Sequence, residues 1–240
     1  AGGYTAVCTM PNLDPVPDSP EHLEAELAAI RKDAAIAVYP YAAITVGEKG
    51  EQLVDLEALA PSAIAYSDDG RGVQSREMMK EAMKRARNLN KIISAHCEDN
   101  ALLFGGYIHD GEYAKAHGHR GICSESEWGP IKRDIELVKE TGCAYHVCHI
   151  STKEEIEMVR AAKSNNPDIV AETSCNYLWF CDEDYDRLGS RLKCNPSVKT
   201  SDDRAALREA LANGMIDTIG SDHAPHLLTE KDGPYTKVPS

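Results

Sequence analysis

Long apolar segments are absent from this 240-residue sequence, although 42% of its residues are hydrophobic. No apolar run approaches the roughly 20 residues that a helix needs to cross a bilayer. The first residues, AGGYTAVCTM, also lack the basic start and apolar stretch of a secretory signal. We therefore expect neither a membrane protein nor an exported one, and we predict a cytoplasmic location.

Positive charge is scarce. The 26 Lys and Arg residues are outnumbered by 39 Asp and Glu residues, which leaves a formal net charge of −13. Such a chain repels the phosphate backbone, so nucleic acid is not an expected partner. An anionic substrate would need a local positive site.

Paired cysteine motifs are missing too. The eight cysteines are scattered without any C-x-x-C pair, at positions 8, 97, 123, 143, 148, 175, 181 and 194. This pattern excludes a small disulfide framework and is typical of buried thiols in a reducing compartment. We predict that no cysteine is a metal ligand.

What the sequence has is a strict alternation of strand-like and helix-like segments. Helical periodicity favours helices at 20–32, 75–88, 126–141, 152–164 and 202–213, with weaker segments near 52–60 and 182–188. Thr152 with Glu155, and Ser126 with Glu127, offer N-cap chemistry, and Gly142 and Gly214 stand where helices should end. Short apolar or β-branched runs predict seven strands, at 4–10, 35–46, 63–67, 91–97, 143–150, 168–175 and 216–221.

This alternation requires a parallel sheet, open or closed. A (β/α)8 barrel lacking its first strand explains seven strands, and a doubly wound sheet explains them without a missing piece. We favour the barrel, because residues 4–10 already have the character of a buried strand and such a strand needs a neighbour. We see no repeats, low-complexity tracts or linker, so we expect one domain over residues 1–240, incomplete at both ends.

Polar side chains stand at the end of nearly every predicted strand or directly after it. Asn12, Asp68 with Asp69, His96, His149 and Asp222 all occupy such positions, and His226 follows in the same S-D-H-A-P-H stretch as Asp222. In a (β/α) barrel these strand ends meet at one mouth, so distant residues can surround a single ion. Imidazoles and carboxylates together suit Zn²⁺ or a comparable divalent ion.

Each of these residues also has a plainer explanation. A single His at a strand end is more often structural than a ligand, D-D-G is good turn chemistry, and Asp222 could simply begin a turn. Strand alternation allows only one of Asp68 and Asp69 to face the mouth. His117-Gly118-His119 has metal-motif spacing, but its polar, glycine-flanked surroundings indicate a solvated loop.

Six ordered motifs resemble those of dihydroorotases, in the class with aspartate where many amidohydrolase relatives use a carboxylated lysine. The motifs are TMPNLDP (9–15), YSDDGRGVQ (66–74), SAHCEDN (94–100), CHIST (148–152), KCNPSVKT (193–200) and GSDHAPH (220–226). The resemblance implies a metal-dependent amidohydrolase barrel that interconverts N-carbamoyl-L-aspartate and dihydroorotate in pyrimidine synthesis. It also implies one or two Zn²⁺ ions per subunit, a homodimer, and association with aspartate transcarbamoylase in some members.

Carried over by motif, the resemblance makes Asp69 the metal-bridging carboxylate and His96 and His149 metal ligands. Asp222 becomes both a metal ligand and the proton-transferring residue. Asn12, Asn195 and His226 become substrate contacts. One family motif, H-x-H-x-R on the first strand, has no match here; we expect that residues upstream supply it.

Two other functions remain open on the sequence. The same chemistry could act on another ring, as in hydantoinases, dihydropyrimidinases or allantoinases, although those relatives generally carry lysine at the bridging position. Alternatively, the chain could be a catalytically silent homologue kept as an assembly partner, although a scaffold needs no ligand set. An acidic, phosphatase-like metal site would leave Asn12 and Asn195 without a role.

Overall fold

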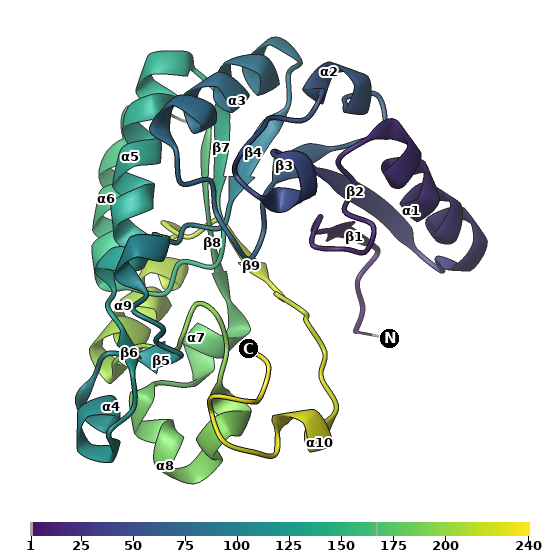
Figure 1. Ribbon diagram of the computed structural model, residues 1–240. Coiled ribbons are helices and arrows are strands. Elements are labelled where there is room, and N and C mark those ends of the chain that lie inside the picture. The colour runs from purple at the N-terminus through teal and green to yellow at the C-terminus, as the bar shows by residue number, and fades with distance from the viewer. Residues whose placement is uncertain (1, 167) are drawn as a thin grey trace. The chain divides into compact units, whose positions relative to one another are not determined.

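The computed structural model describes residues 2–166 and 168–240 (Figure 1). The chain divides into two compact units, unit 1 with residues 1–96 and 133–146 and unit 2 with residues 97–132 and 147–240. A single domain over the whole chain stays a prediction. None of the helices in the described part of the chain is long and apolar enough to cross a membrane.

Unit 1 is built on parallel strands that pair in chain order. They are β1 (Ala6–Thr9), β2 (Ala37–Ala43), β3 (Ala65–Ser67) and β4 (Ile92–Ala95). Ala65 on β3 stands opposite Tyr41 on one side and Ile92 on the other, which sets the register of the sheet. β7 (Ala144–Val147) begins in unit 1 and ends in unit 2. All of these strands were predicted from the sequence.

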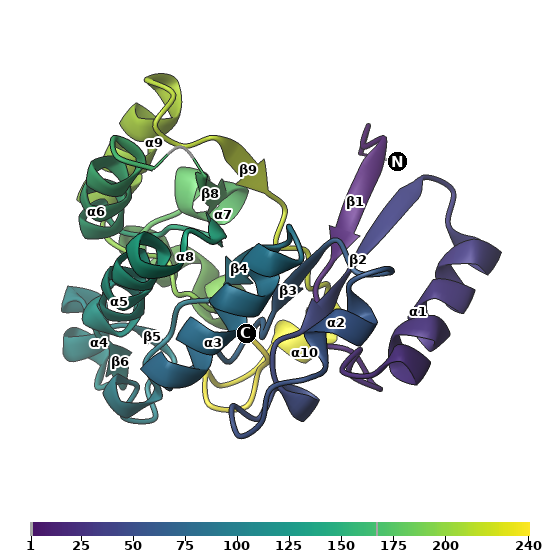
Figure 2. The same cartoon turned by 90° about the horizontal axis from the view of Figure 1, so that it is seen from above.

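The helices of unit 1 cover this sheet and bury its core. They are α1 (Pro20–Asp33), α2 (Leu56–Leu59) and α3 (Arg76–Asn88), and a 3₁₀ turn lies at Val46–Glu48. Ser19 caps α1 by accepting a hydrogen bond from His22 N, and Pro20 follows at the first helical position. α1 packs against β2 (Figure 2), and α3 packs against β4 through its buried face, which includes Met79 and Met83.

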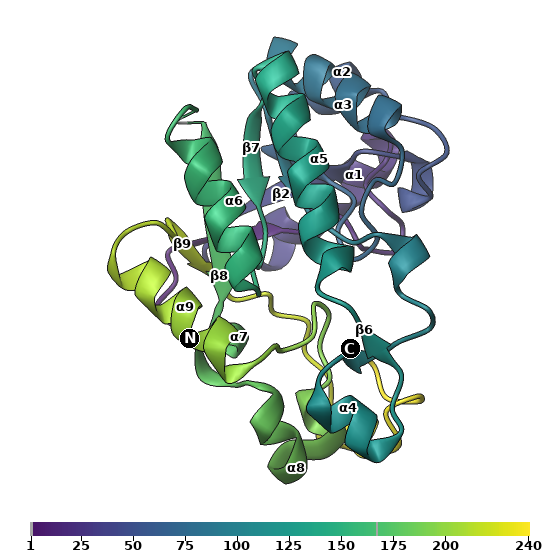
Figure 3. The ribbon, with the colours of Figure 1, turned by 90° about the vertical axis from the view of Figure 1, so that its left-hand side faces the viewer.

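Unit 2 holds the later β–α segments. β8 (Ile169–Ser174) pairs in parallel with β9 (Thr218–Gly220), and α6 (Lys153–Lys163) lies beside α9 (Ser201–Ala212) (Figure 3). α5 (Glu125–Thr141) begins in unit 2 and ends in unit 1. Shorter helices are α7 (Cys175–Trp179), α8 (Tyr185–Leu188) and α10 (Leu228–Lys231), with 3₁₀ turns at Asn100–Leu102, Asp182–Asp184 and Gly189–Leu192.

The residues at the helix ends are those predicted from the sequence, with one exception. Thr152 and Glu155 form the predicted capping box of α6, and Gly142 and Gly214 take the left-handed conformation, with φ of 68° and 76°. The predicted N-cap at Ser126 is wrong, because α5 starts at Glu125. Ser126 lies within the first turn, where its hydroxyl donates to Cys123 O over 2.7 Å.

The segment around His117 and His119 is ordered, which corrects the prediction of a solvated loop. It forms β5 (Ile108–His109), α4 (Glu112–His117) and β6 (Gly121–Ile122), and β5 pairs with β6. His117 is exposed as predicted, but the His119 ring packs edge-on against Tyr235 and its Nδ1 lies 3.1 Å from the Tyr107 hydroxyl. Aromatic partners distant in sequence hold this segment, and periodicity alone does not reveal them.

Among the described residues the cysteines are free thiols, as expected, but they are not all buried. Cys97, Cys143, Cys148 and Cys181 are buried, whereas Cys8 and Cys175 are exposed. The prediction of buried thiols is therefore wrong for Cys8 on β1 and for Cys175 at the start of α7.

Candidate functional site

Two consecutive aspartates follow β3 in unit 1, and they have different partners. Asp68 is buried, with 3% of its surface exposed. Its Oδ1 accepts hydrogen bonds from Ile44 N and Thr45 N over 2.8 and 3.0 Å, and its Oδ2 accepts one from the Thr45 hydroxyl over 2.5 Å. Burial raises the pKa of Asp68 to about 6, and these hydrogen bonds oppose the shift. Asp68 is thus a structural residue that ties β3 to the end of β2.

Asp69 instead lies beside His96, which follows β4. Asp69 Oδ1 is 3.8 Å from His96 Nδ1, and both residues are buried, with 9% and 4% exposure. Asp69 Oδ2 accepts a hydrogen bond from Asn12 Nδ2 over 3.1 Å. Unit 1 therefore brings together three of the predicted site residues. A carboxylate oxygen and an imidazole nitrogen this close suit a shared divalent cation such as zinc.

Glu48 is a buried acidic residue of unit 1 that belongs to none of the sequence motifs. It is 6% exposed and has a φ of 53°, and its Oε1 has no hydrogen-bond partner among the described residues. Burial, followed by the charges of Asp68 and Asp69, raises the pKa of Glu48 to about 7. The flanking Gly47 and Gly50 signal a turn, but nothing in V-G-E-K-G indicates that the glutamate points inward.

In unit 2, His149 is buried at 6% exposure and has a φ of 37°. Its backbone N donates to Glu172 Oε1 on β8 over 3.4 Å. The next residue, Ile150, donates from N to Glu172 O over 2.7 Å and accepts the Thr173 hydroxyl at its own carbonyl over 2.7 Å. β8 therefore holds the backbone at His149 in a conformation that non-glycine residues seldom adopt.

The remaining predicted residues also lie in unit 2. Asn195 is half-buried, and the carbonyl of the following Pro196 accepts the Tyr177 hydroxyl over 2.7 Å. Asp222, with a φ of 44°, and His226 follow β9 and are exposed; His226 Nδ1 lies 3.7 Å from Glu230 Oε2 on α10. Unit 2 thus places His149 in the interior and Asp222 and His226 at the surface.

The sequence of the chain is similar to those of bacterial dihydroorotases. It is 50% identical over 231 residues to the dihydroorotase of Bacillus caldolyticus, an alignment that covers 96% of this chain and 54% of that protein. It is 47% identical over 232 residues to the dihydroorotase of Bacillus subtilis, covering 96% of this chain and 54% of that protein. The chain thus spans about half the length of the curated relatives it matches.

Solved structures confirm the fold class. An L-hydantoinase (dihydropyrimidinase) from Arthrobacter aurescens matches with a TM-score of 0.82 at 23% identity, covering 96% of this chain and 53% of that one. A dihydroorotase from Saccharomyces cerevisiae, in complex with 5-fluoroorotic acid, matches with a TM-score of 0.78 at 17% identity, covering 99% and 66%. The amidohydrolase barrel is the predicted class, and the doubly wound alternative is set aside.

A family model gives the assignment. The model described as dihydro-orotase-like matches residues 1–155, which include the aspartates after β3 and the histidines at positions 96 and 149. Taken with the sequence relatives, this match shows that the chain belongs to the dihydro-orotase-like family of the amidohydrolase superfamily.

Proposed function

We propose that the complete protein is a dihydroorotase, which interconverts N-carbamoyl-L-aspartate and dihydroorotate in de novo pyrimidine synthesis. The observation that carries the proposal is the buried pair of Asp69 and His96, placed after neighbouring strands of a dihydro-orotase-like chain. The bacterial dihydroorotases that are about half identical support the same reaction. We also propose a cytoplasmic location, a homodimer and, as a further partner, aspartate transcarbamoylase.

The proposed metal ligands are Asp69, His96, His149 and Asp222, with one or two Zn²⁺ ions per subunit. The donor set fits, because carboxylate and imidazole are ligands of this ion and Asp69 and His96 already lie together. When bound, such an ion lowers the pKa of water to about 7 and so supplies a nucleophile at neutral pH. Residues upstream of this chain would add the H-x-H-x-R motif.

The remaining roles belong to side chains of this chain. Asp222 takes the proton from the attacking water and returns it to the departing ring nitrogen. Asn12, Asn195 and His226 contact the substrate. Ring opening creates a carboxylate and releases a proton, so alkaline pH favours opening and acidic pH favours closure, whatever the enzyme.

Metal content and dihydroorotate hydrolysis test the proposal. Both are measured on the 240-residue chain and on the same chain extended to its natural start. Metal and activity in the extended protein are the expected result. An extended protein without metal and without activity would favour the silent assembly partner instead.

A second candidate is a hydantoinase-type activity, favoured by the likeness in fold to an L-hydantoinase. The two consecutive aspartates after β3 speak against it, because those relatives generally carry lysine at the bridging position. Turnover of hydantoin without turnover of dihydroorotate would establish this alternative.

A further inference from the structure

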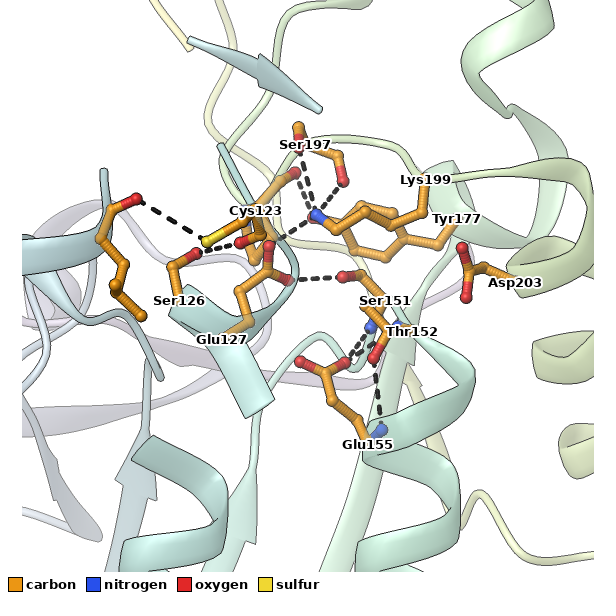
Figure 4. A network of polar contacts seen from close by, with 12 residues as sticks. Cys123, Ser126, Glu127, Ser151, Thr152, Glu155, Tyr177, Ser197, Lys199 and Asp203 are labelled. Atoms are coloured by element: carbon orange, nitrogen blue, oxygen red, sulfur yellow. Dashed lines mark hydrogen bonds and ion pairs between the residues drawn. The ribbon is translucent and has the colours of Figure 1, made fainter. Parts of the chain in front are cut away.

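Unit 2 contains a fully enclosed ammonium group outside the proposed set of metal ligands and substrate contacts. Lys199 is 3% exposed, and its Nζ lies 2.5 Å from Glu127 Oε1 (Figure 4). The same Nζ donates to Ser197 O over 2.7 Å and to the Ser197 hydroxyl over 3.1 Å. Buried charges persist only when they are paired and hydrogen-bonded, and Lys199 meets both conditions.

Glu127 links Lys199 to Ser151. Its Oε2 accepts the Ser151 hydroxyl over 2.5 Å, and Glu127 itself is 4% exposed. Ser151 N and Thr152 N then donate to Glu155 Oε2 over 2.7 and 2.9 Å. Figure 4 shows this unbroken chain of contacts from the 195–199 segment, through the first turn of α5, to the 148–152 segment.

Both ends of this series of hydrogen bonds stand next to proposed site residues. Ser197 follows Asn195 by two residues, and Ser151 follows His149 by two residues. The backbone at His149 has independent support from β8, through Glu172 and Thr173. Near Asn195, the Pro196 carbonyl accepts a hydrogen bond from the Tyr177 hydroxyl, and the ends of the 193–199 segment are bonded by Lys231 Nζ to Lys193 O and by Asp182 N to Lys199 O. Lys199 bonds Ser197 directly but reaches Ser151 only through Glu127, so loss of Lys199 should loosen Asn195 more than His149.

We propose that Lys199 is a positioning residue: paired with Glu127, it holds Asn195 in place relative to the 148–152 segment and so sets substrate affinity. This inference rests on the proposed function, in which Asn195 contacts the substrate. A merely structural ion pair would affect folding stability alone. Removing both charges together distinguishes the two roles. No unpaired buried charge then remains to lower stability, whereas the bond that positions Asn195 is still lost.

The experiment compares Lys199→Met, Lys199→Arg and the double variant Lys199→Met with Glu127→Gln in the complete, metal-loaded protein. The readouts are KM and kcat for dihydroorotate, Kd for 5-fluoroorotic acid, melting temperature and metal content. Lys163→Met is the matched control. Lys163 Nζ also bonds a carboxylate and a main-chain carbonyl, at Asp217 and Met215 over 2.5 and 2.8 Å, but Asp217 precedes β9, at the end of the strand opposite Asp222.

Lys199→Met should raise KM and Kd at least tenfold, with kcat within about threefold and unchanged metal content, and should lower the melting temperature. The double variant should regain most of the melting temperature and keep the raised KM and Kd. Lys199→Arg, which retains the charge, should return both constants to within about threefold of the parent. Lys163→Met should lower the melting temperature only.

Recovery of KM and Kd along with stability in the double variant would overturn the positioning role, as would a normal KM and Kd in Lys199→Met. A parent protein that neither turns over dihydroorotate nor binds 5-fluoroorotic acid would overturn the proposed function, and this inference with it. An active parent whose Lys199 variants bind normally would overturn the inference alone.

Discussion

Asn12 Nδ2 donates a hydrogen bond of 3.1 Å to Asp69 Oδ2, although 57 residues separate the two in sequence. Asn12 follows β1 and Asp69 follows β3, and β2 lies between these strands in the sheet of unit 1. Parallel strands end at the same edge of a sheet, so two residues predicted for different tasks become neighbours. The contact leaves Asp69 Oδ1 facing His96 Nδ1 at 3.8 Å.

Alanine substitutions of the two adjacent aspartates should affect different properties of the protein. Asp69→Ala in the complete protein should lower metal content and dihydroorotate turnover with little loss of stability. Asp68→Ala should instead lower the free energy of unfolding by roughly 1–3 kcal/mol for each buried donor left unpaired. Metal analysis and urea unfolding measure the two effects. Full metal occupancy in Asp69→Ala would move the bridging role to Asp68 or elsewhere.

Asp222→Asn should remove most activity while the fold stays intact. Removing a general acid–base group typically costs about 10² to 10⁴ in rate. Asp222 follows β9 and is exposed, and asparagine has nearly the same shape as aspartate. Initial rates and circular dichroism measure the two properties. Asp232→Asn, at another exposed aspartate, is the control and should turn over substrate normally. Near-normal turnover by Asp222→Asn would remove it from proton transfer.

Stability should fall in mild acid because of His109. Burial lowers the pKa of His109 to about 4, from 6.5. Between pH 4 and pH 6.5 the unfolded chain binds more protons than the folded chain. The contribution of His109 to the free energy of unfolding is therefore complete above pH 6.5 and is lost as the pH falls to 4. The free energy of unfolding should drop by roughly 1–3 kcal/mol over this range.

Variants of two histidines test that assignment. His109→Phe keeps a ring and removes the ionisable group, so its stability should vary less between pH 6.5 and 4 than that of the parent. His117→Gln, at an exposed position on α4, should retain the parental profile. Urea unfolding at several pH values provides the comparison, and an unchanged slope in His109→Phe would assign the acid sensitivity to other groups.

Tyr145→Phe should destabilise unit 1. The Tyr145 hydroxyl donates to Asp134 Oδ2 over 3.0 Å, and Asp134 is 0% exposed. Removing the Tyr145 hydroxyl takes a hydrogen-bond donor from the buried Asp134 carboxylate. Among the described residues, Arg133 Nε still donates to Asp134 Oδ1 over 2.8 Å. We expect a loss of roughly 1–3 kcal/mol in the free energy of unfolding. Tyr39→Phe, at a side chain 47% exposed, is the control and should cost little.

The sequence by itself determined the order of the main helices and of all strands except β5 and β6, together with the fold class and the family. Apolar runs and helical periodicity are local signals, and β–α alternation leaves few topologies open. The polar residues at the ends of most strands were visible for the same reason, and so was the capping box of Thr152 and Glu155.

Only the tertiary structure decided what each polar group touches. Asp68 and Asp69 are adjacent and chemically identical, and partners 23 and 57 residues away give them different tasks. The inward turn of Glu48, the packing of His119 on Tyr235 and the enclosure of Lys199 beside Glu127 likewise depend on distant segments. Burial and hydrogen bonding are properties of the folded surroundings, and a residue's neighbours in sequence do not specify them.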